Sequence, residues 1–223
     1  MAIMIGDIHG NADKVRAFLA YKPDQEHVAI GDYLDSFVEP FERQLECLHL
    51  LMNSDAVLLL GNHDVHYLQY PLFQFSGYQH ENAAKFQDIL EGNLSRFKVA
   101  HAVDGWLCTH AGVSSQLAEE TSDVAALADL FNNRWEHYLA NRSAQDKSDY
   151  EYKSLFTFNY FCYVEGNLLA ENVRQIFGHM ELKTPDVTDT YIALDTTNSG
   201  DNSYWLYDTE AGQLVELCNS EVK

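Results

Sequence analysis

Three short apolar segments in the first 60 residues each end at a glycine, and a helical pattern separates each segment from the next. Residues 2–5, 27–30 and 56–60 have the length and composition of buried strands. Residues 12–21 and 40–52 carry apolar side chains at helical spacing, and Asn11 is suited to cap the first helix. Strand–helix–strand units of this length predict parallel β-α-β crossovers, which place the loops after the strands at one edge of a sheet.

Side chains that can bind metals follow these strands and two later ones. The first strand leads into "GDIHG", where Asp7 and His9 can face one cation from a loop that glycine lets turn sharply. Taken alone, this motif could equally be a helix cap beside a polar turn. Related motifs, "GDYLDS", "GNHD", "THAG" and "GHM", follow four other apolar strands. The recurrence predicts a metal site made of Asp7, His9, Asp32, Asn62, His110 and His179.

These residue types suit a pair of metal ions. Asp32 can bridge two ions through its two carboxylate oxygens, and Asp7 and His9 would complete the protein ligands of the first ion. The second ion would take the remaining ligands, Asn62, His110 and His179. Mixed oxygen and nitrogen ligands favour manganese, with iron or zinc as alternatives. Two ions about 3.5–4 Å apart can activate a bridging hydroxide for in-line attack on phosphorus, so no serine or cysteine nucleophile is required.

The remainder of the chain alternates helices and strands without a repeat, a low-complexity tract or a linker. Helices are predicted over residues 82–90 and 123–139, and strands over residues 97–103, 106–109 and 175–177. Three later runs are typical of antiparallel strands, namely 191–195, 203–208 and 213–218. Residues 149–166 are rich in aromatic side chains and fit a strand or a helix equally well. We therefore expect a single domain over residues 1–223.

The charge of the chain limits its partners. Lysine and arginine number 14 against 34 aspartates and glutamates, which gives a net charge of −20. Such a surface repels nucleic acid and anionic membranes, so neither is an expected partner. Phosphate chemistry in this chain needs a local positive centre, and bound metal ions would supply one.

The cysteines and the N-terminus indicate a cytoplasmic protein. The four cysteines, Cys47, Cys108, Cys162 and Cys218, are far apart and form no CxxC pair, so we interpret them as reduced thiols. The sequence has neither a signal peptide nor an apolar stretch long enough to span a membrane.

The five motifs, in this order, resemble those of the calcineurin-like metallophosphoesterases, and within them the phosphoprotein phosphatase type found in bacteria and phages. The resemblance covers about residues 3–215 and includes "YIALDTT" after the last histidine. It implies an α/β fold with four layers (α/β/β/α), in which helices flank a central β sandwich and the metal site lies at strand ends. It further implies that His63 is the general acid that protonates the leaving oxygen and that Asp35 orients its ring. The other histidines match no ligand of the family and are interpreted as surface or core residues: His66, His80, His101 and His137.

The sequence departs from the family at one position. Many members carry an arginine directly after the second aspartate of "GDxxD", where it clamps the phosphate, but this chain has Ser36 followed by Phe37. Arg134, in "NNRWEHY", resembles an arginine of bacterial relatives and is the candidate replacement. Arg142 and Arg174 are reserve candidates, although both suit a surface position.

Three functions remain open. The first is hydrolysis of phosphomonoesters, either on phosphoserine or phosphothreonine in proteins or on small phosphoesters. The second is symmetrical hydrolysis of diadenosine tetraphosphate, because "GNHDVHYL" and "THAGV" also resemble the enzymes with that activity, and Trp135 or the aromatic stretch could stack on adenine. The third is an inactive metal-binding regulatory protein. His63 and Asp35 argue against the third, because a protein that only binds metal does not need a paired general acid.

Overall fold

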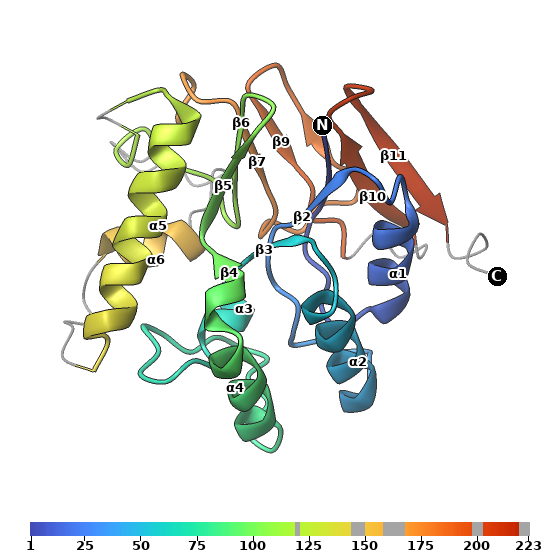
Figure 1. The fold of residues 1–223 in the computed structure, drawn as a ribbon, viewed down its shortest axis with the longest axis vertical. Coiled ribbons are helices and arrows are strands. Elements are labelled where there is room, and N and C mark those ends of the chain that lie inside the picture. The colour runs from blue at the N-terminus through green and yellow to red at the C-terminus, as the bar shows by residue number, and fades with distance from the viewer. Residues whose placement is uncertain (119–120, 144–149, 158–167, 198–202, 219–223) are drawn as a thin grey trace.

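The apolar runs form two β-sheets in the computed structural model of the chain, which describes residues 1–118, 121–143, 150–157, 168–197 and 203–218 (Figure 1). The first sheet has the order β11 (Gln213–Cys218), β10 (Ser203–Asp208), β1 (Ala2–Ile5), β2 (Glu26–Ala29), β3 (Val57–Leu59), β4 (Phe97–Lys98). The second has the order β5 (Ala100–Val103), β6 (Trp106–Thr109), β7 (Gln175–Phe177), β9 (Tyr191–Ala193), β8 (Asp186–Val187). Strands β1 to β4 are parallel, as are β6, β7 and β9.

Alternating side chains of the strands pack into two different layers. Ile3 and Ile5 of β1 belong to the cluster that includes Phe18 of α1 (Ala12–Ala20). Met4 points the other way and packs with Cys108 of β6 in the layer between the two sheets. Neighbouring residues of a strand face opposite sides of its sheet. Because the residues of β1 on both sides are apolar, both faces of the sheet are buried.

Helices cover the outer faces of the sheets. The first sheet is covered by α1 and α2 (Phe41–Met52), and the second by α5 (Val124–Asn141), whose Leu127, Phe131 and Trp135 are buried in the core. Figure 1 shows α5 on the opposite side of the molecule from α1 and α2. The remaining helices are α3 (Asn62–Val65), α4 (Ala83–Gly92), the 3-10 helix η1 (Leu94–Arg96) and α6 (Tyr150–Thr157). The predicted α/β/β/α architecture is confirmed.

The helix starts follow from their capping residues. The side chain of Asn11 accepts a hydrogen bond from the Lys14 N–H at 2.9 Å, and Asp123 accepts from Ala125 at 2.9 Å. A side-chain oxygen at this position satisfies backbone donors that have no partner inside the helix. Among the described residues, no helix has the length and apolar character needed to cross a membrane.

The prediction of one strand over residues 97–103 is wrong, because this segment passes from one sheet to the other. Its first part, β4, pairs with β3, whereas β5 pairs with β6. Between them, the N–H groups of Val99 and Ala100 donate to the side-chain oxygen of Asn132 on α5, at 3.1 and 3.3 Å. These bonds take the backbone out of the first ladder, and α5 thereby fixes the point at which the chain changes sheets.

The prediction of antiparallel pairing for residues 191–195 is also wrong in part. Strand β9 pairs in parallel with β7 and antiparallel with the short β8, so it belongs to the second sheet. Only β10 and β11 form the expected antiparallel hairpin, and this hairpin joins the first sheet beside β1. Two sheets therefore contribute strand ends to the candidate site, where a doubly wound sheet would have used one.

Candidate metal centre

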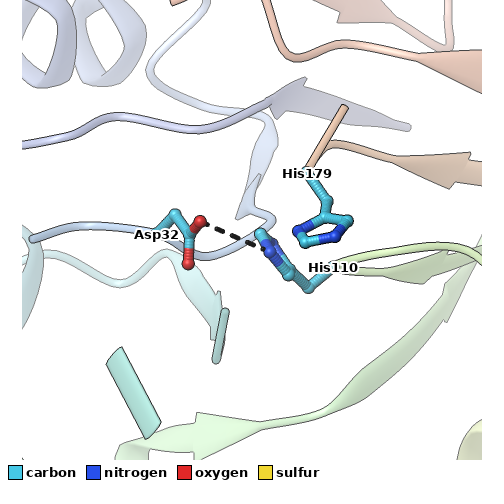
Figure 2. Close-up of side chains that lie close together, drawn as sticks. All are labelled: Asp32, His110 and His179. Atoms are coloured by element: carbon cyan, nitrogen blue, oxygen red, sulfur yellow. Dashed lines mark ion pairs between the residues drawn. The ribbon is translucent and has the colours of Figure 1, made fainter. Parts of the chain in front are cut away.

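The carboxyl ends of five strands bring the predicted ligands together. Asp7 and His9 follow β1, Asp32 follows β2, and Asn62 begins α3 after β3. From the second sheet, His110 directly follows β6 and His179 lies two residues after β7. Candidate ligand atoms lie within 4.8 Å of one another in two groups that share Asp32, namely Asp7–His9–Asp32 and Asp32–His110–His179. Figure 2 shows the second group, with the Asp32 carboxylate facing the rings of both histidines.

The first group surrounds a nitrogen of His9. The Nδ1 of His9 lies 2.7 Å from the carbonyl oxygen of Leu34, and because a carbonyl can only accept, Nδ1 donates its proton there. Nε2 is then free to bind a cation, and it lies 3.9 Å from Asp7 Oδ2 and 3.9 Å from Asp32 Oδ2. Asp7 and His9 thus face the same point in the structure, and their role as ligands of one cation stays a prediction.

The second group places acceptor atoms against one another. His110 Nδ1 donates to the Ile30 carbonyl at 3.0 Å, while its Nε2 lies 2.8 Å from Asn62 Oδ1 and 3.5 Å from Asp32 Oδ2. Burial lowers the pKa of His110 well below its usual value, so Nε2 carries no proton at neutral pH. Burial also lowers the pKa of His179 to about 4, and its Nδ1 lies 2.8 Å from the same Asn62 oxygen. Converging acceptors of this kind fit a cation.

The buried carboxylates also indicate a site for a cation. Burial, and next the charge of Asp195, raise the pKa of Asp7 well above its usual value. Burial, followed by the charges of Asp7 and Asp64, does the same for Asp32. Candidate ligand oxygens of Asp7 and Asp32 lie within 4.8 Å of each other. Two buried anions this close together destabilise the folded state unless positive charge compensates them. Their oxygens, together with imidazole nitrogens and an amide oxygen, form the mixed donor set that manganese, iron and zinc accept.

Two glycines of the motifs make room for these carboxylates. A Cβ at Gly61 would lie 2.1 Å from Asp32 Oδ1, and one at Gly178 would lie 2.0 Å from Asp7 Oδ1. The oxygen of Asp7 also accepts the N–H of His179 at 2.9 Å, and His179 adopts a φ of 68°. The glycine therefore lets the loop after β7 approach the loop after β1, and the contact holds His179 in an unfavourable backbone conformation. Asp7 caps no helix, contrary to the alternative interpretation of "GDIHG".

We expect Gly178→Ala to lower the affinity for divalent metal about 10- to 100-fold, the range typical of changes that displace a ligand indirectly. The added methyl group would push the Asp7 carboxylate away from His9. Isothermal titration calorimetry of metal-stripped protein with Mn²⁺ measures this affinity. Gly92→Ala is the matched control, because a Cβ at this position of α4 would meet no atom within 4 Å apart from its chain neighbours and the backbone of its own helix. Equal affinities in the two variants would mean that Asp7 accommodates the methyl group without moving.

A paired histidine borders the first group. His63 Nδ1 lies 2.8 Å from Asp35 Oδ2, and the backbone N–H of His63 donates to Asp32 Oδ1 at 2.8 Å. The rings of His63 and His9 are 5.2 Å apart at their centroids, with nearly perpendicular planes. Since Nδ1 donates to the carboxylate, Nε2 is the nitrogen left to exchange a proton with a substrate. The contact expected between Asp35 and His63 is therefore present.

Sequence reasoning missed a buried carboxylate that joins two of the loops. Asp64 accepts hydrogen bonds from the backbone N–H groups of Asp32, Tyr33 and Gly61, at 2.8, 2.9 and 2.9 Å. Burial raises its pKa to about 7, although the three donors oppose that rise. The available signal was its place directly after "GNH", where an acid on a short helix can reach the neighbouring loop. Asp64 thus sets the distance between the loop of Asp32 and the residue Asn62.

Two other buried charges lie behind the first group. Lys14 donates through Nζ to the backbone oxygen of Asp7, and Asp195 is buried after β9. The charge of Asp195 raises the pKa of Asp7, whereas that of Lys14 lowers it. The only signal in the sequence was the acid in "YIALDTT", which no spacing rule connects to Asp7.

The structure accounts for Ser36 and for the reserve arginines. The hydroxyl of Ser36 accepts the N–H of Glu39 at 2.9 Å, so this residue shapes the turn before α2. Arg142 makes a bidentate ion pair with Glu91, at 2.8 and 2.7 Å, and the Arg174 guanidinium lies 3.9 Å above the centre of the Trp106 ring. Arg134 is half-buried on α5, and its contact with phosphate stays a prediction.

Three solved structures with similar folds are named as phosphatases, one of them as a putative one. The cold-active protein-tyrosine phosphatase of the psychrophile Shewanella sp. matches 98% of this chain and 77% of its own, with 15% identity and a TM-score of 0.64. A putative diadenosine tetraphosphatase matches 97% of this chain and 92% of its own, with 18% identity and a TM-score of 0.62. A serine/threonine phosphatase from Saccharomyces cerevisiae matches 97% and 78%, with 14% identity and a TM-score of 0.59. These likenesses establish the fold.

No curated protein sequence matches the chain. A family model, that of calcineurin-like phosphoesterases, matches residues 2–190 and thus spans every motif from "GDIHG" to "GHM". The chain therefore belongs to the calcineurin-like phosphoesterase family, and it is a phosphoric ester hydrolase of the binuclear metallophosphatase class.

Proposed function

We propose that the protein hydrolyses phosphomonoesters in the manner of the serine/threonine protein phosphatases, with phosphoprotein or small phosphoester substrates. The observation that carries the proposal is the His63–Asp35 pair beside Asp32. A histidine with one nitrogen engaged by a carboxylate and the other free is suited to give a proton to a leaving oxygen. An inactive metal-binding protein would have no use for this pair.

In this proposal two metal ions occupy the two groups described above. Asp32 would contact both ions, with Asp7 and His9 on one side and with His110, His179 and the Asn62 oxygen on the other. When bound, such ions would offset the charge of the phosphoryl oxygens and lower the pKa of a water molecule. Manganese is our preferred identity for both, with iron or zinc as alternatives, because of the mixed ligand set.

The side chains of the chain then supply the acid half of the reaction. As hydroxide, the deprotonated form of that water, attacks the phosphorus and the ester P–O bond breaks, the leaving oxygen would take the proton from His63 Nε2, which leaves His63 neutral. Asp35 holds Nδ1–H and stabilises the positive charge that His63 carries before the transfer. Hydrogen-bond donors around Asp35 outweigh its burial and lower its pKa, which keeps this carboxylate ionised.

The charge balance favours a monoester over diadenosine tetraphosphate. Four phosphates in a row need more positive charge than one, yet Ser36 replaces the usual arginine, and Arg142 is already paired with Glu91. In this proposal one phosphate is held mainly by the metals, with Arg134 as the candidate arginine. The dinucleotide remains the second candidate because of its sequence resemblance and because Phe37, exposed over 83% of its surface, follows Ser36 and could stack on a base.

A comparison of two substrates tests the proposal. Protein reconstituted with Mn²⁺ is assayed on a phosphothreonine peptide and on diadenosine tetraphosphate, with metal-stripped protein as the control. We expect a higher kcat/KM for the peptide and no turnover without metal. Release of two ADP molecules from the dinucleotide at the higher rate would replace the proposal with the second candidate. Tight metal binding with hydrolysis of neither substrate would favour the regulatory protein.

We also propose a cytoplasmic location, with no nucleic acid or membrane as a partner. Cys47 and Cys108, the cysteines whose side chains the structure describes, are both buried free thiols. Cys162 and the side chain of Cys218 lie outside the described part. Reduced thiols and a net charge of −20 support this location and this choice of partners.

A further inference from the structure

The carboxylate of Asp35 contacts three side chains, whereas the family resemblance implied only His63. His63 Nδ1 lies 2.8 Å from Oδ2, and His66 Nε2 lies 2.7 Å from the same oxygen. The hydroxyl of Tyr67 donates to the other oxygen, Oδ1. The interpretation of His66 as a surface or core residue is therefore incomplete: its side chain is fully buried, but it is in contact with the proposed acid pair.

The backbone fixes the direction of both additional donors. The N–H of Phe75 donates to His66 Nδ1 at 3.3 Å, so the proton of a neutral His66 is on Nε2, which faces Asp35. That nitrogen makes no hydrogen bond of regular geometry with a described residue, and its close contact is the Asp35 oxygen 2.7 Å away. The N–H of Gln79 donates to the Tyr67 hydroxyl at 2.8 Å, which directs the hydroxyl proton toward Asp35. The segment 75–79 thus orients two donors toward one carboxylate.

We propose that His66 is a positioning residue for His63, and that it acts by holding the Asp35 carboxylate in the orientation that receives His63 Nδ1–H. The inference rests on the proposed function. Asp35 itself adopts a φ of 62°, and burial leaves its side chain dependent on donors to stay ionised. With His66 and Tyr67 in place, both oxygens are engaged and the carboxylate cannot rotate away from His63. Without His66, Oδ2 keeps His63 as its one partner and the His63 ring gains freedom to turn.

Two substitutions separate this role from a structural one. His66→Leu removes the donor and keeps an apolar side chain of moderate size, whereas His66→Gln replaces the ring with an amide that can donate to Asp35. We expect His66→Leu to lower kcat about 10-fold on phenyl phosphate, whose leaving group needs a proton, and much less on 4-nitrophenyl phosphate. KM should change little, and His66→Gln should restore most of the rate. Equal losses on both substrates, or no rescue by glutamine, would overturn the proposal.

A double substitution tests whether His66 acts through His63. In a His63→Asn background, His66→Leu should cause no further loss on phenyl phosphate, because the group that it positions is absent. A further loss of about 10-fold would show that His66 acts independently. Tyr67→Phe keeps the ring and removes the donor to Oδ1, so it provides the same comparison if His66→Leu does not fold.

A spectroscopic measurement keeps this inference distinct from the proposed function. In metal-stripped protein, the ¹⁵N NMR spectrum of the histidine side chains should show one tautomer of neutral His63, with its proton on Nδ1. In His66→Leu we expect a mixture of tautomers, and in His66→Gln a return to one. If wild-type protein hydrolyses no aryl phosphate but the tautomers change as expected, the proposed function fails and the positioning role stands. Unchanged tautomers in His66→Leu would refute the positioning role, whatever the activity.

Discussion

Asp32→Asn should abolish phosphoester hydrolysis, because Asp32 is the residue that both candidate metal groups share. An amide has one coordinating oxygen and no charge, so it cannot serve two cations as a carboxylate does. Turnover should be lost because the protein binds metal less tightly. We expect the metal affinity to fall by more than about 100-fold, which exceeds the range seen for residues that only support ligands. Metal content after dialysis and Mn²⁺ titration measure this fall directly, and turnover should become undetectable.

The same substitution should have the opposite effect on the stability of metal-free protein. In the wild type, burial and the charges of Asp7 and Asp64 raise the pKa of Asp32, so at neutral pH the ionised form makes the folded state less stable. Asparagine has no charge to bury and keeps an oxygen for the His63 N–H, which Asp32 Oδ1 accepts at 2.8 Å. We therefore expect the metal-free variant to be at least as stable as metal-free wild type in thermal unfolding.

Asp24→Asn is a suitable control, since Asp24 is exposed and lies before β2. It should leave both metal affinity and turnover unchanged. If metal-free Asp32→Asn unfolds at a clearly lower temperature than wild type, the carboxylate has a structural role that does not depend on metal. If it retains two metal ions, Asp32 is not the shared ligand.

The parts of the fold that local sequence signals determine were predicted. Asn11 caps α1, and Asp123 starts α5, because the side chain and the N–H groups it satisfies lie within one turn. The sheet change at Val99 could not be predicted in this way. Its cause is Asn132, a residue on a helix much later in the chain, and nothing near Val99 indicates that its N–H leaves the ladder.

The candidate ligands were found for a related reason. Each one follows an apolar strand within a few residues, and parallel pairing brings the carboxyl ends of such strands to one side. Asp64 and His66 escaped detection because their importance comes from partners that only folding brings near, namely the loop of Asp32 and the carboxylate of Asp35. A polar residue in a short helix has no spacing that reveals such partners in advance.

The burial of Trp135 on α5 is another feature that could not be predicted from the sequence. Trp135, proposed from the sequence as a surface for adenine, is buried in α5 and stacks on Tyr138, with 5.2 Å between ring centroids. A ring in this position is part of the core, so the base-binding interpretation does not hold for it. Of the stretch itself, residue 149 and residues 158–166 lie outside the described part of the chain.

His63→Asn should lower kcat by roughly 10²- to 10⁴-fold on a substrate with a poor leaving group, the range associated with loss of a general acid. The metal groups should survive, because the contact of residue 63 with Asp32 is made by its backbone N–H. Metal affinity should therefore stay near that of the wild type, in contrast to Asp32→Asn. On 2,4-dinitrophenyl phosphate, whose leaving group needs no proton, we expect a far smaller loss.

This dependence on the leaving group is what distinguishes a lost proton donor from a damaged site. Displacement of a metal would lower the rate on both substrates together, since the ions contact the phosphoryl group whatever leaves it. A plot of log kcat against the pKa of the leaving group should be nearly flat for the wild type and steep for His63→Asn. A wild-type rate on phenyl phosphate in the variant would remove His63 from the mechanism, and with it the reason for three side chains to contact the carboxylate of Asp35.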